Sequence, residues 1–187
     1  MRNEVAVRQR HRGRGGESPV VQSDEFLYFL ADWYRTLRDR QKRLANHVYE
    51  NAYDQSSTKP AIRVLLVDDH ARVRAALRDL LESYPNLSLV GEASNGEEAV
   101  RLVRDLSPSV VVMDINMPKL NGIDATMRIK TSYPHVVIVG LSVSASDAHR
   151  RAMTAAGATT LISKYMAVEQ LYVEIQAAIN GRSTSNH

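Results

Sequence analysis

The feature that most constrains this fold is a regular alternation of strand-like and helix-like segments after Pro60. Short apolar runs, typical of strands buried on both faces, alternate with longer segments whose apolar residues recur every three or four positions. The strand patterns fall at about 62–67, 87–92, 109–114, 136–141 and 159–163, and the helical patterns at about 71–83, 96–106, 122–132, 146–156 and 167–180. Five such repeats predict an α/β domain, a doubly wound parallel sheet with helices on both faces and right-handed crossovers.

The segment in front of this domain differs in composition. It begins with arginines, glycines and a proline, which indicate a disordered basic arm, and continues with an apolar stripe at helical spacing. One helix cannot bury such a stripe alone, so it docks on the domain, pairs with a second copy as a homodimer, or binds a partner. We expect Gly181 to end the last helix. The predicted organisation is a disordered basic arm (1–22), an amphipathic helix (23–53), a linker (54–60), the α/β domain (61–181) and a tail (182–187).

Composition excludes several classes of protein. The chain has no cysteine, which rules out disulfide frameworks and thiolate metal sites. It has no membrane-length apolar run and no apolar stretch of a secretory signal near its start, so we expect a cytoplasmic location without membrane contact. Residues 1–59 hold 11 Lys/Arg and 8 Asp/Glu, whereas residues 60–187 hold 13 of each. The net charge of +3 therefore comes from the N-terminal segment. Such basic arms sometimes touch nucleic acid or anionic lipid, but more often they are solvated tails, which is the interpretation we favour.

Polar and charged residues stand where four of the predicted strands end. Asp68 and Asp69 close the first strand, Asp114 the third, Ser142 the fourth and Lys164 the fifth. In a flavodoxin-like sheet of strand order 2-1-3-4-5 these strands are contiguous, and their carboxyl ends line one crevice. Three clustered carboxylates repel one another unless a hard cation or a proton sits among them. The set predicts a divalent metal site with an aspartate nucleophile, and a lysine and a hydroxyl that receive a phosphoryl group.

The segments around these residues resemble a known family. They read VLLVDDH at 64–70, VVVMDINMPKLNGID at 110–124, VGLS at 139–142 and AGATTLISK at 156–164. Together they resemble the receiver domain of two-component response regulators, and the resemblance covers residues 61–180. The spacings agree: 45 residues from Asp69 to Asp114, 28 from Asp114 to Ser142 and 22 from Ser142 to Lys164. The details most resemble the subgroup whose receivers are usually followed by a C-terminal helix-turn-helix.

The resemblance implies a phosphoryl acceptor and its cation. Asp114 would take a phosphoryl group from a histidine kinase or a phosphotransfer protein and form an acyl phosphate. Asp69, Asp114 and the backbone carbonyl of Asn116 would ligate Mg²⁺, with Asp68 assisting directly or through water. Independent physics agrees, because in-line phosphoryl transfer needs positioning and charge neutralisation, and Mg²⁺ prefers a few protein oxygens plus waters and phosphate.

The same resemblance implies roles for three further residues and a second role for Asn116. Lys164 would pair with Asp114 or with the phosphoryl oxygens. Ser142 would hydrogen-bond the phosphoryl group and draw the following loop inward, which is a local event able to bias a two-state surface. Asn116 and Ser144 occupy positions that modulate hydrolysis of the acyl phosphate in this family.

Each residue also has a purely structural interpretation. Asp68 or Asp69 could cap the helix that follows them, because aspartate is a frequent N-cap. Lys164 could be a surface ammonium, and Ser142 could be a turn residue. These readings are reasonable for one residue at a time, but they do not explain four strand ends together.

Two histidines invite other functions. His70 has no second histidine or cysteine at ligand spacing, so the sequence does not predict a zinc site there. His47 lies in the predicted N-terminal helix, and its neighbours do not resemble a kinase histidine box. We therefore expect His47 to be solvated or packed.

The sequence departs from the family pattern in three places. Leu161 stands three residues before the lysine, where the family often has an aromatic residue whose rotation reports phosphorylation, so an aromatic switch is not expected. Tyr165 follows the lysine in place of a frequent proline, so no cis-proline turn is expected. The sequence ends at His187 without the helix-turn-helix of the subgroup. We expect the signal to pass through Ser142 and the loop and helix after it.

Two functions follow as hypotheses. The first is a receiver without its own output domain that signals by phosphorylation-controlled contact with a downstream protein. The second is a DNA-binding transcriptional regulator whose output module is missing or replaced by the basic N-terminal segment, although the chain has no recognised DNA-binding domain. An enzyme is not expected, because the chain has no Gly-rich phosphate loop and no second acid two residues after Asp114, where Asn116 stands.

Overall fold

The computed structural model describes Asp32 and residues 61–183. Asp32, in the predicted N-terminal helix, is helical and exposed. The rest of the predicted arm, helix and linker (1–22, 23–53 and 54–60), with His47, lies outside the described residues, as do residues 184–187. In the described part of the chain, no helix combines the length and the apolar character needed to cross a membrane.

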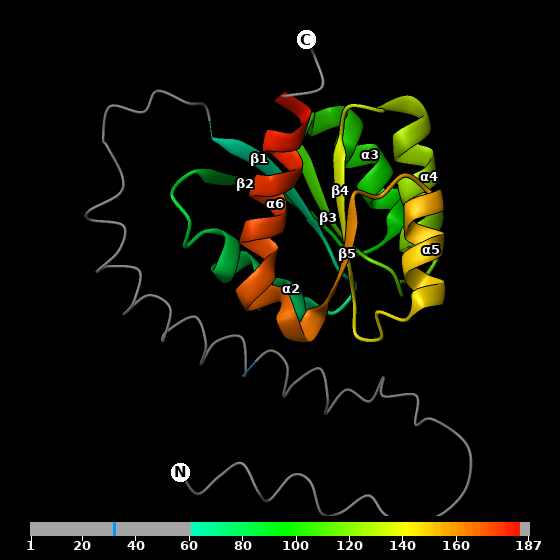
Figure 1. Ribbon diagram of the computed structural model, residues 1–187, viewed down its shortest axis with the longest axis horizontal. Helices are drawn as coiled ribbons and strands as arrows, with labels where there is room; N and C mark the ends of the chain where they lie inside the picture. The colour runs from blue at the N-terminus through cyan, green and yellow to red at the C-terminus, as the bar shows by residue number, and fades with distance from the viewer. Residues whose placement is uncertain (1–31, 33–60, 184–187) are drawn as a thin grey trace, which may run out of the picture.

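A five-stranded parallel sheet forms the centre of the fold, in the order β2-β1-β3-β4-β5 (Figure 1). The strands are β1 (Ile62–Val67), β2 (Leu87–Ala93), β3 (Val110–Asp114), β4 (Val137–Ser142) and β5 (Thr160–Ser163). The predicted strand order and flavodoxin-like fold are confirmed. Because β1, β3, β4 and β5 are neighbours, their carboxyl ends lie side by side at one edge of the sheet.

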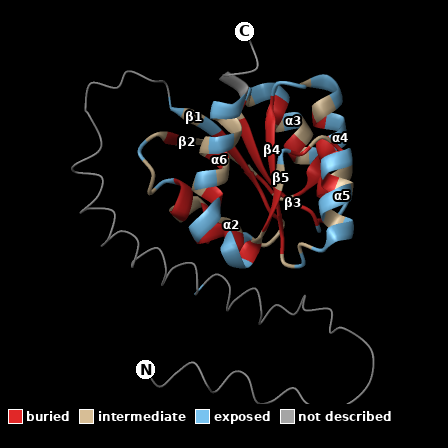
Figure 2. Ribbon diagram, viewed as in Figure 1, coloured by how far each residue is buried: buried red, intermediate tan, exposed pale blue. Residues whose placement is uncertain are grey.

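Helices cover both faces of the sheet. They are α2 (Ala71–Leu81), α3 (Gly96–Leu106), α4 (Gly122–Ser132), α5 (Asp147–Ala155) and α6 (Ala167–Ser183). α2 and α6 pack on one face, and α3, α4 and α5 pack on the other. Successive strand residues alternate between the two cores: Leu66 belongs to the first, and Leu65 and Val67 belong to the second. Figure 2 shows the buried strands between helices whose outer sides are exposed.

Side-chain caps fix where three of the helices begin. Asn95, Asn121 and Ser146 each accept a hydrogen bond from a backbone N–H three residues later, over 3.0, 2.9 and 3.3 Å respectively. Such caps satisfy amide donors that a helix start leaves without partners. His70 is the N-cap residue of α2, but its side chain makes no capping hydrogen bond. The expectation that Asp68 or Asp69 could cap α2 is therefore wrong by position, since both precede that residue.

The structure corrects the predicted end of the domain. The prediction that Gly181 stops the last helix is wrong, because α6 continues to Ser183, into the segment predicted as a tail. Among the described glycines only Gly157 has a positive φ, so Gly181 does not take the left-handed conformation that ends many helices. A 3-10 turn over Lys164–Met166, capped by Ser163, also joins β5 to α6 where the sequence predicted only a boundary.

Candidate functional site

Three predicted site residues meet at the carboxyl edge of the sheet. Lys164 Nζ lies 2.6 Å from Asp68 Oδ2 and 2.9 Å from Asp114 Oδ2. Asp68 follows β1, Asp114 ends β3, and Lys164 follows β5, so the strand order brings together side chains from three separate segments. All three are almost fully buried. The lysine is therefore not a surface ammonium but a buried charge with two carboxylate partners.

The cluster holds more negative than positive charge. With Asp69 included, three carboxylates face one ammonium, which leaves two negative charges uncompensated when all are ionised. Burial, together with the charges of Asp68 and Asp69, raises the pKa of Asp114 to about 6 although Lys164 opposes the shift. Burial also opposes the charged form of Lys164, but the Asp68 and Asp114 carboxylates outweigh it and raise the pKa of the lysine. A dication would match the excess charge.

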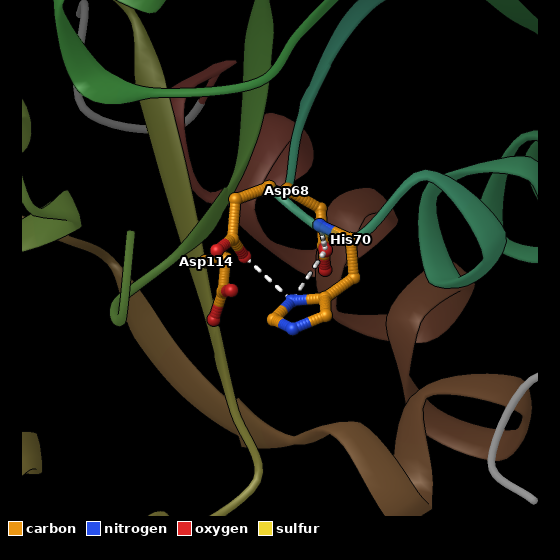
Figure 3. A group of neighbouring side chains, drawn as sticks. Asp68, His70 and Asp114 are labelled. Atoms are coloured by element: carbon orange, nitrogen blue, oxygen red, sulfur yellow. Dashed lines mark hydrogen bonds and ion pairs between the residues drawn. The ribbon is translucent and has the colours of Figure 1, made fainter. Parts of the chain in front are cut away.

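The cluster opens toward solvent on the side of Asp69 and His70. Asp69 is 22% exposed and His70 is 35% exposed, and His70 Nδ1 lies 2.6 Å from Asp69 Oδ1. Figure 3 shows the His70 imidazole turned back toward the carboxylates of Asp68 and Asp114. An open hollow of about 520 Å³ lies beside them, lined by Asp69, His70, Asn116, Met117, Pro118 and Asn121. The cluster is therefore accessible from the hollow on this side.

Comparison with known proteins assigns the family. The family model named response regulator receiver domain matches residues 64–176 of this chain. The chain belongs to this family. Response regulator UvrY of Escherichia coli (strain K12) is 39% identical over 121 residues, covering 65% of this chain and 56% of UvrY. A two-component response regulator of the LuxR family from Aurantimonas sp. SI85-9A1 has a similar structure, with 34% identity, a TM-score of 0.63 and coverage of 65% of this chain and 86% of that chain.

The response regulator domain of Thermotoga maritima CheB is also similar, with 34% identity, a TM-score of 0.61 and coverage of 64% of this chain and 97% of that domain. This chain spans about half the length of the curated relatives it matches. Receiver domains are signalling domains of two-component systems that interact with histidine kinases or phosphotransfer proteins. They bind Mg²⁺ in an acidic pocket, and Asp68, Asp69 and Asp114 form an acidic cluster in this receiver.

One predicted residue of this receiver points elsewhere. Ser142 is buried at the end of β4, but its Oγ donates to the Ser144 carbonyl over 3.0 Å and accepts from the Ser144 N–H over 3.2 Å. The Nδ1 atom of His149 lies 2.6 Å from the same carbonyl. Ser142 therefore serves as a turn residue in this conformation, and Ser144 is exposed at the tip of its loop.

The residues of this receiver fit a bound divalent cation. Asp69 Oδ1 is buried and has no hydrogen-bond partner, although a carboxylate oxygen out of contact with water normally has one. Asn116 is exposed beside it and lines the same hollow, so its backbone lies on the open side of the cluster. A buried carboxylate oxygen without a hydrogen-bond donor, next to excess negative charge, fits the role of a magnesium ligand.

Two residues near the site were missed or set aside by sequence reasoning. Arg74 Nη1 donates to the Asp68 carbonyl over 2.6 Å, and Arg74 Nε donates to Glu92 on β2 over 3.1 Å. Arg74 thus holds the backbone of the first acid. Its place in the first turn of α2, directly after the acidic strand end, was the available signal. His70, set aside as a zinc ligand, has its Nδ1 inside the acidic cluster.

Leu161 lies in the position of the frequent aromatic residue. It is buried in the second core, against α5 and Gly140. An added Cβ on Gly140 would come within 2.8 Å of Leu161 Cδ1, which shows how closely the leucine lies over β4. The leucine is thus a packed core residue in this receiver.

Proposed function

We propose that this receiver accepts a phosphoryl group on Asp114 from the phosphohistidine of a histidine kinase or phosphotransfer protein, in the presence of Mg²⁺. The observation that carries the proposal is the buried contact of Lys164 with both Asp68 and Asp114, beside an acid that faces an open hollow. Burying one ammonium against two carboxylates is expensive if it serves stability alone, whereas a phosphorylation site needs this charge arrangement.

The acids have distinct roles toward the cation. Asp69 and Asp114 would bind Mg²⁺ with their carboxylates, the Asn116 carbonyl would supply a third oxygen, and Asp68 would assist. Mg²⁺ held by these residues would neutralise the charge of the incoming phosphoryl oxygens and of the acids around them. Few protein oxygens are needed, because Mg²⁺ keeps several waters and phosphate oxygens in its coordination sphere.

The transfer itself requires little of the protein beyond position and charge. Lys164 holds Asp114 Oδ2, and we assign the other oxygen, Oδ1, as the attacking atom. Its bond to phosphorus forms as the bond from phosphorus to the donor imidazole nitrogen breaks. The other ring nitrogen of the donor carries a proton, so the imidazole leaves in its neutral form when the bonding electron pair returns to the nitrogen that held the phosphorus. Lys164 remains beside the product and stabilises the phosphoryl charge. The receiver is a substrate in this transfer and not an enzyme acting on a third molecule.

The signal leaves through residues that adjoin the site. A phosphoryl group adds a charge of about −1.5 to −2 and three strong acceptor oxygens, which can draw the Ser142 hydroxyl away from Ser144. Lys164 is buried, whereas Tyr165 and Met166 directly after it are 41% and 37% exposed. A shift of the lysine is thereby coupled to apolar surface that a downstream protein can recognise.

Family membership also supports a cytoplasmic location.

The test is direct phosphorylation of the full chain. The protein is incubated with Mg²⁺ and acetyl phosphate or phosphoramidate, and intact mass is followed over time. A labile adduct of one phosphoryl group should form, should disappear with EDTA, and should be lost in Asp114→Asn. The exposed Asp147→Asn is the matched control and should still form the adduct. Failure of every donor, including a cognate histidine kinase, would contradict the proposal.

A further inference from the structure

His70 is held next to the acidic cluster by its own backbone. Its N–H donates to Asp68 Oδ1 over 2.9 Å, and its φ and ψ of −86° and 105° keep it extended between β1 and α2. The imidazole makes no hydrogen bond that caps α2. The ring is therefore not used to begin the helix, and it folds back over the carboxyl edge of the sheet (Figure 3).

The ring nitrogen closest to the acids has an unusual environment. His70 Nδ1 is buried, although about a third of the side chain is exposed, and it lies 2.6 Å from Asp69 Oδ1 and 3.9 Å from Asp68 Oδ1. Nδ1 and Asp69 Oδ1 are close enough for an ion pair if the histidine is protonated, but neither atom has a hydrogen-bond partner. Their separation of 2.6 Å is also compatible with two adjacent ligands of one cation.

The distances fit a single ion. Asp68, Asp69, His70 and Asp114 each offer one ligand atom, and these four atoms all lie within 4.8 Å of one another. A cation at roughly 2.0–2.6 Å from each ligand requires opposite ligands to be no more than about 5 Å apart. The adjoining hollow, lined by Asn116 and Asn121, leaves the remaining positions to water and phosphoryl oxygens.

We propose that His70 is a fourth protein ligand of this cation and that its imidazole makes the site bind divalent transition metals, with Mn²⁺ as the probe, more tightly than an all-oxygen site would. This inference rests on the proposed phosphorylation site, whose cation it concerns. An imidazole nitrogen adds affinity for first-row transition metals, whereas Mg²⁺ gains little from nitrogen and keeps its oxygen ligands. His70 therefore sets metal preference and not the ability to accept phosphate.

The direct experiment detects a coordinated imidazole nitrogen by its magnetic coupling to bound Mn²⁺. Electron spin-echo envelope measurements on the full chain loaded with Mn²⁺ should show modulation from a coordinated imidazole ¹⁴N, which should vanish in His70→Gln. The exposed His135→Gln is the matched control and should keep the modulation. Calorimetric titration should show about tenfold weaker Mn²⁺ binding in His70→Gln, while Mg²⁺ affinity changes less than about twofold. Retained Mg²⁺ binding also reports that the variant is folded.

The competing interpretation is an ion pair between His70 and Asp69 without metal contact. Wild-type protein that binds Mn²⁺ without ¹⁴N modulation, or His70→Gln that binds Mn²⁺ as tightly as wild type, would overturn the inference. Phosphorylation of Asp114 with Mg²⁺ would persist in that case, so the proposed function would stand. If the wild-type protein instead bound neither metal and formed no phosphoryl adduct, both the proposed function and this inference would be contradicted.

Discussion

A buried, hydrogen-bonded ion pair joins Lys164 to Asp68 over 2.6 Å, although 96 positions separate them in the sequence. The same ammonium lies 2.9 Å from Asp114, so Lys164 ties the ends of β1 and β3 to the turn after β5. A charge shared in this way links Asp114 to the turn over Lys164–Met166, in which Tyr165 and Met166 are exposed. It also means that the lysine cannot move toward a phosphoryl group without changing its contact with Asp68.

Replacing Lys164 should show how much the stability of the fold depends on its ion pairs with Asp68 and Asp114. Without divalent cation, Lys164→Met should lower the free energy of unfolding by about 3 kcal/mol, because it leaves buried carboxylates without their counter-charge. Urea denaturation in EDTA and in Mg²⁺ measures the effect, and Mg²⁺ should recover part of the loss. Arg128→Met, at an exposed position on α4, is the control and should change stability little. Equal losses in the two variants would contradict this account of the pair.

The pH dependence of metal-free stability should reveal Asp114. Its pKa is about 6 in the folded protein, against an ordinary value of 3.8, so the folded state binds more protons than the unfolded state between these values. Stability should therefore fall as pH rises from about 4 to 6, by up to about 3 kcal/mol from this group.

Asp114→Asn has no charge at that position and escapes the penalty. In EDTA at pH 7 it should be more stable than the wild type, and the difference should shrink toward pH 4.5. Thermal unfolding across this range checks the prediction. A variant less stable than wild type at pH 7 in EDTA would show that the contact with Lys164 outweighs burial.

Ser142 should affect both the stability of the protein and its response to a phosphoryl mimic. Ser142→Ala removes both hydrogen bonds between its hydroxyl and the Ser144 backbone and should lower stability by about 1 kcal/mol. It should also reduce the rise in Tm that Mg²⁺ with beryllofluoride, a phosphoryl mimic, gives the wild type. Ser144→Ala keeps the backbone groups that Ser142 contacts and serves as the control in scanning calorimetry. If both variants respond to the mimic like wild type, Ser142 takes no part in recognising the phosphoryl group.

Gly122 and Gly181 should respond in opposite directions to alanine. A Cβ on Gly122 would lie 2.0 Å from the Asp114 backbone oxygen, whereas a Cβ on Gly181 would meet nothing within 4 Å. Gly122→Ala should therefore destabilise the protein by more than about 2 kcal/mol and slow phosphorylation, because the backbone of the acceptor must shift. Gly181→Ala should stabilise α6 by up to about 1 kcal/mol. Urea unfolding with the acetyl phosphate assay measures both, and a neutral Gly122→Ala would contradict the close packing at β3.

The order of elements was accessible from local pattern. Apolar runs and helical periodicity placed every described strand and helix within about two residues, apart from the end of α6 and the 3-10 turn. Those two depend on backbone conformation near Gly181 and Lys164, which periodicity does not encode. Leu161 illustrates the same limit, because its burial against Gly140 follows from how β4 and β5 pair and not from its immediate neighbours.

The sequence by itself determined that acids, a hydroxyl and a lysine stand at strand ends, and that a parallel sheet carries those ends to one edge. Only the tertiary structure decided their partners: Lys164 bridges two acids, Ser142 turns to Ser144, and the imidazole of His70 enters the cluster. The physical reason is that the spacing of strands and helices along the chain limits which strand ends can lie side by side. Which atoms then pair depends on competition for hydrogen bonds and charge among side chains that are distant in sequence.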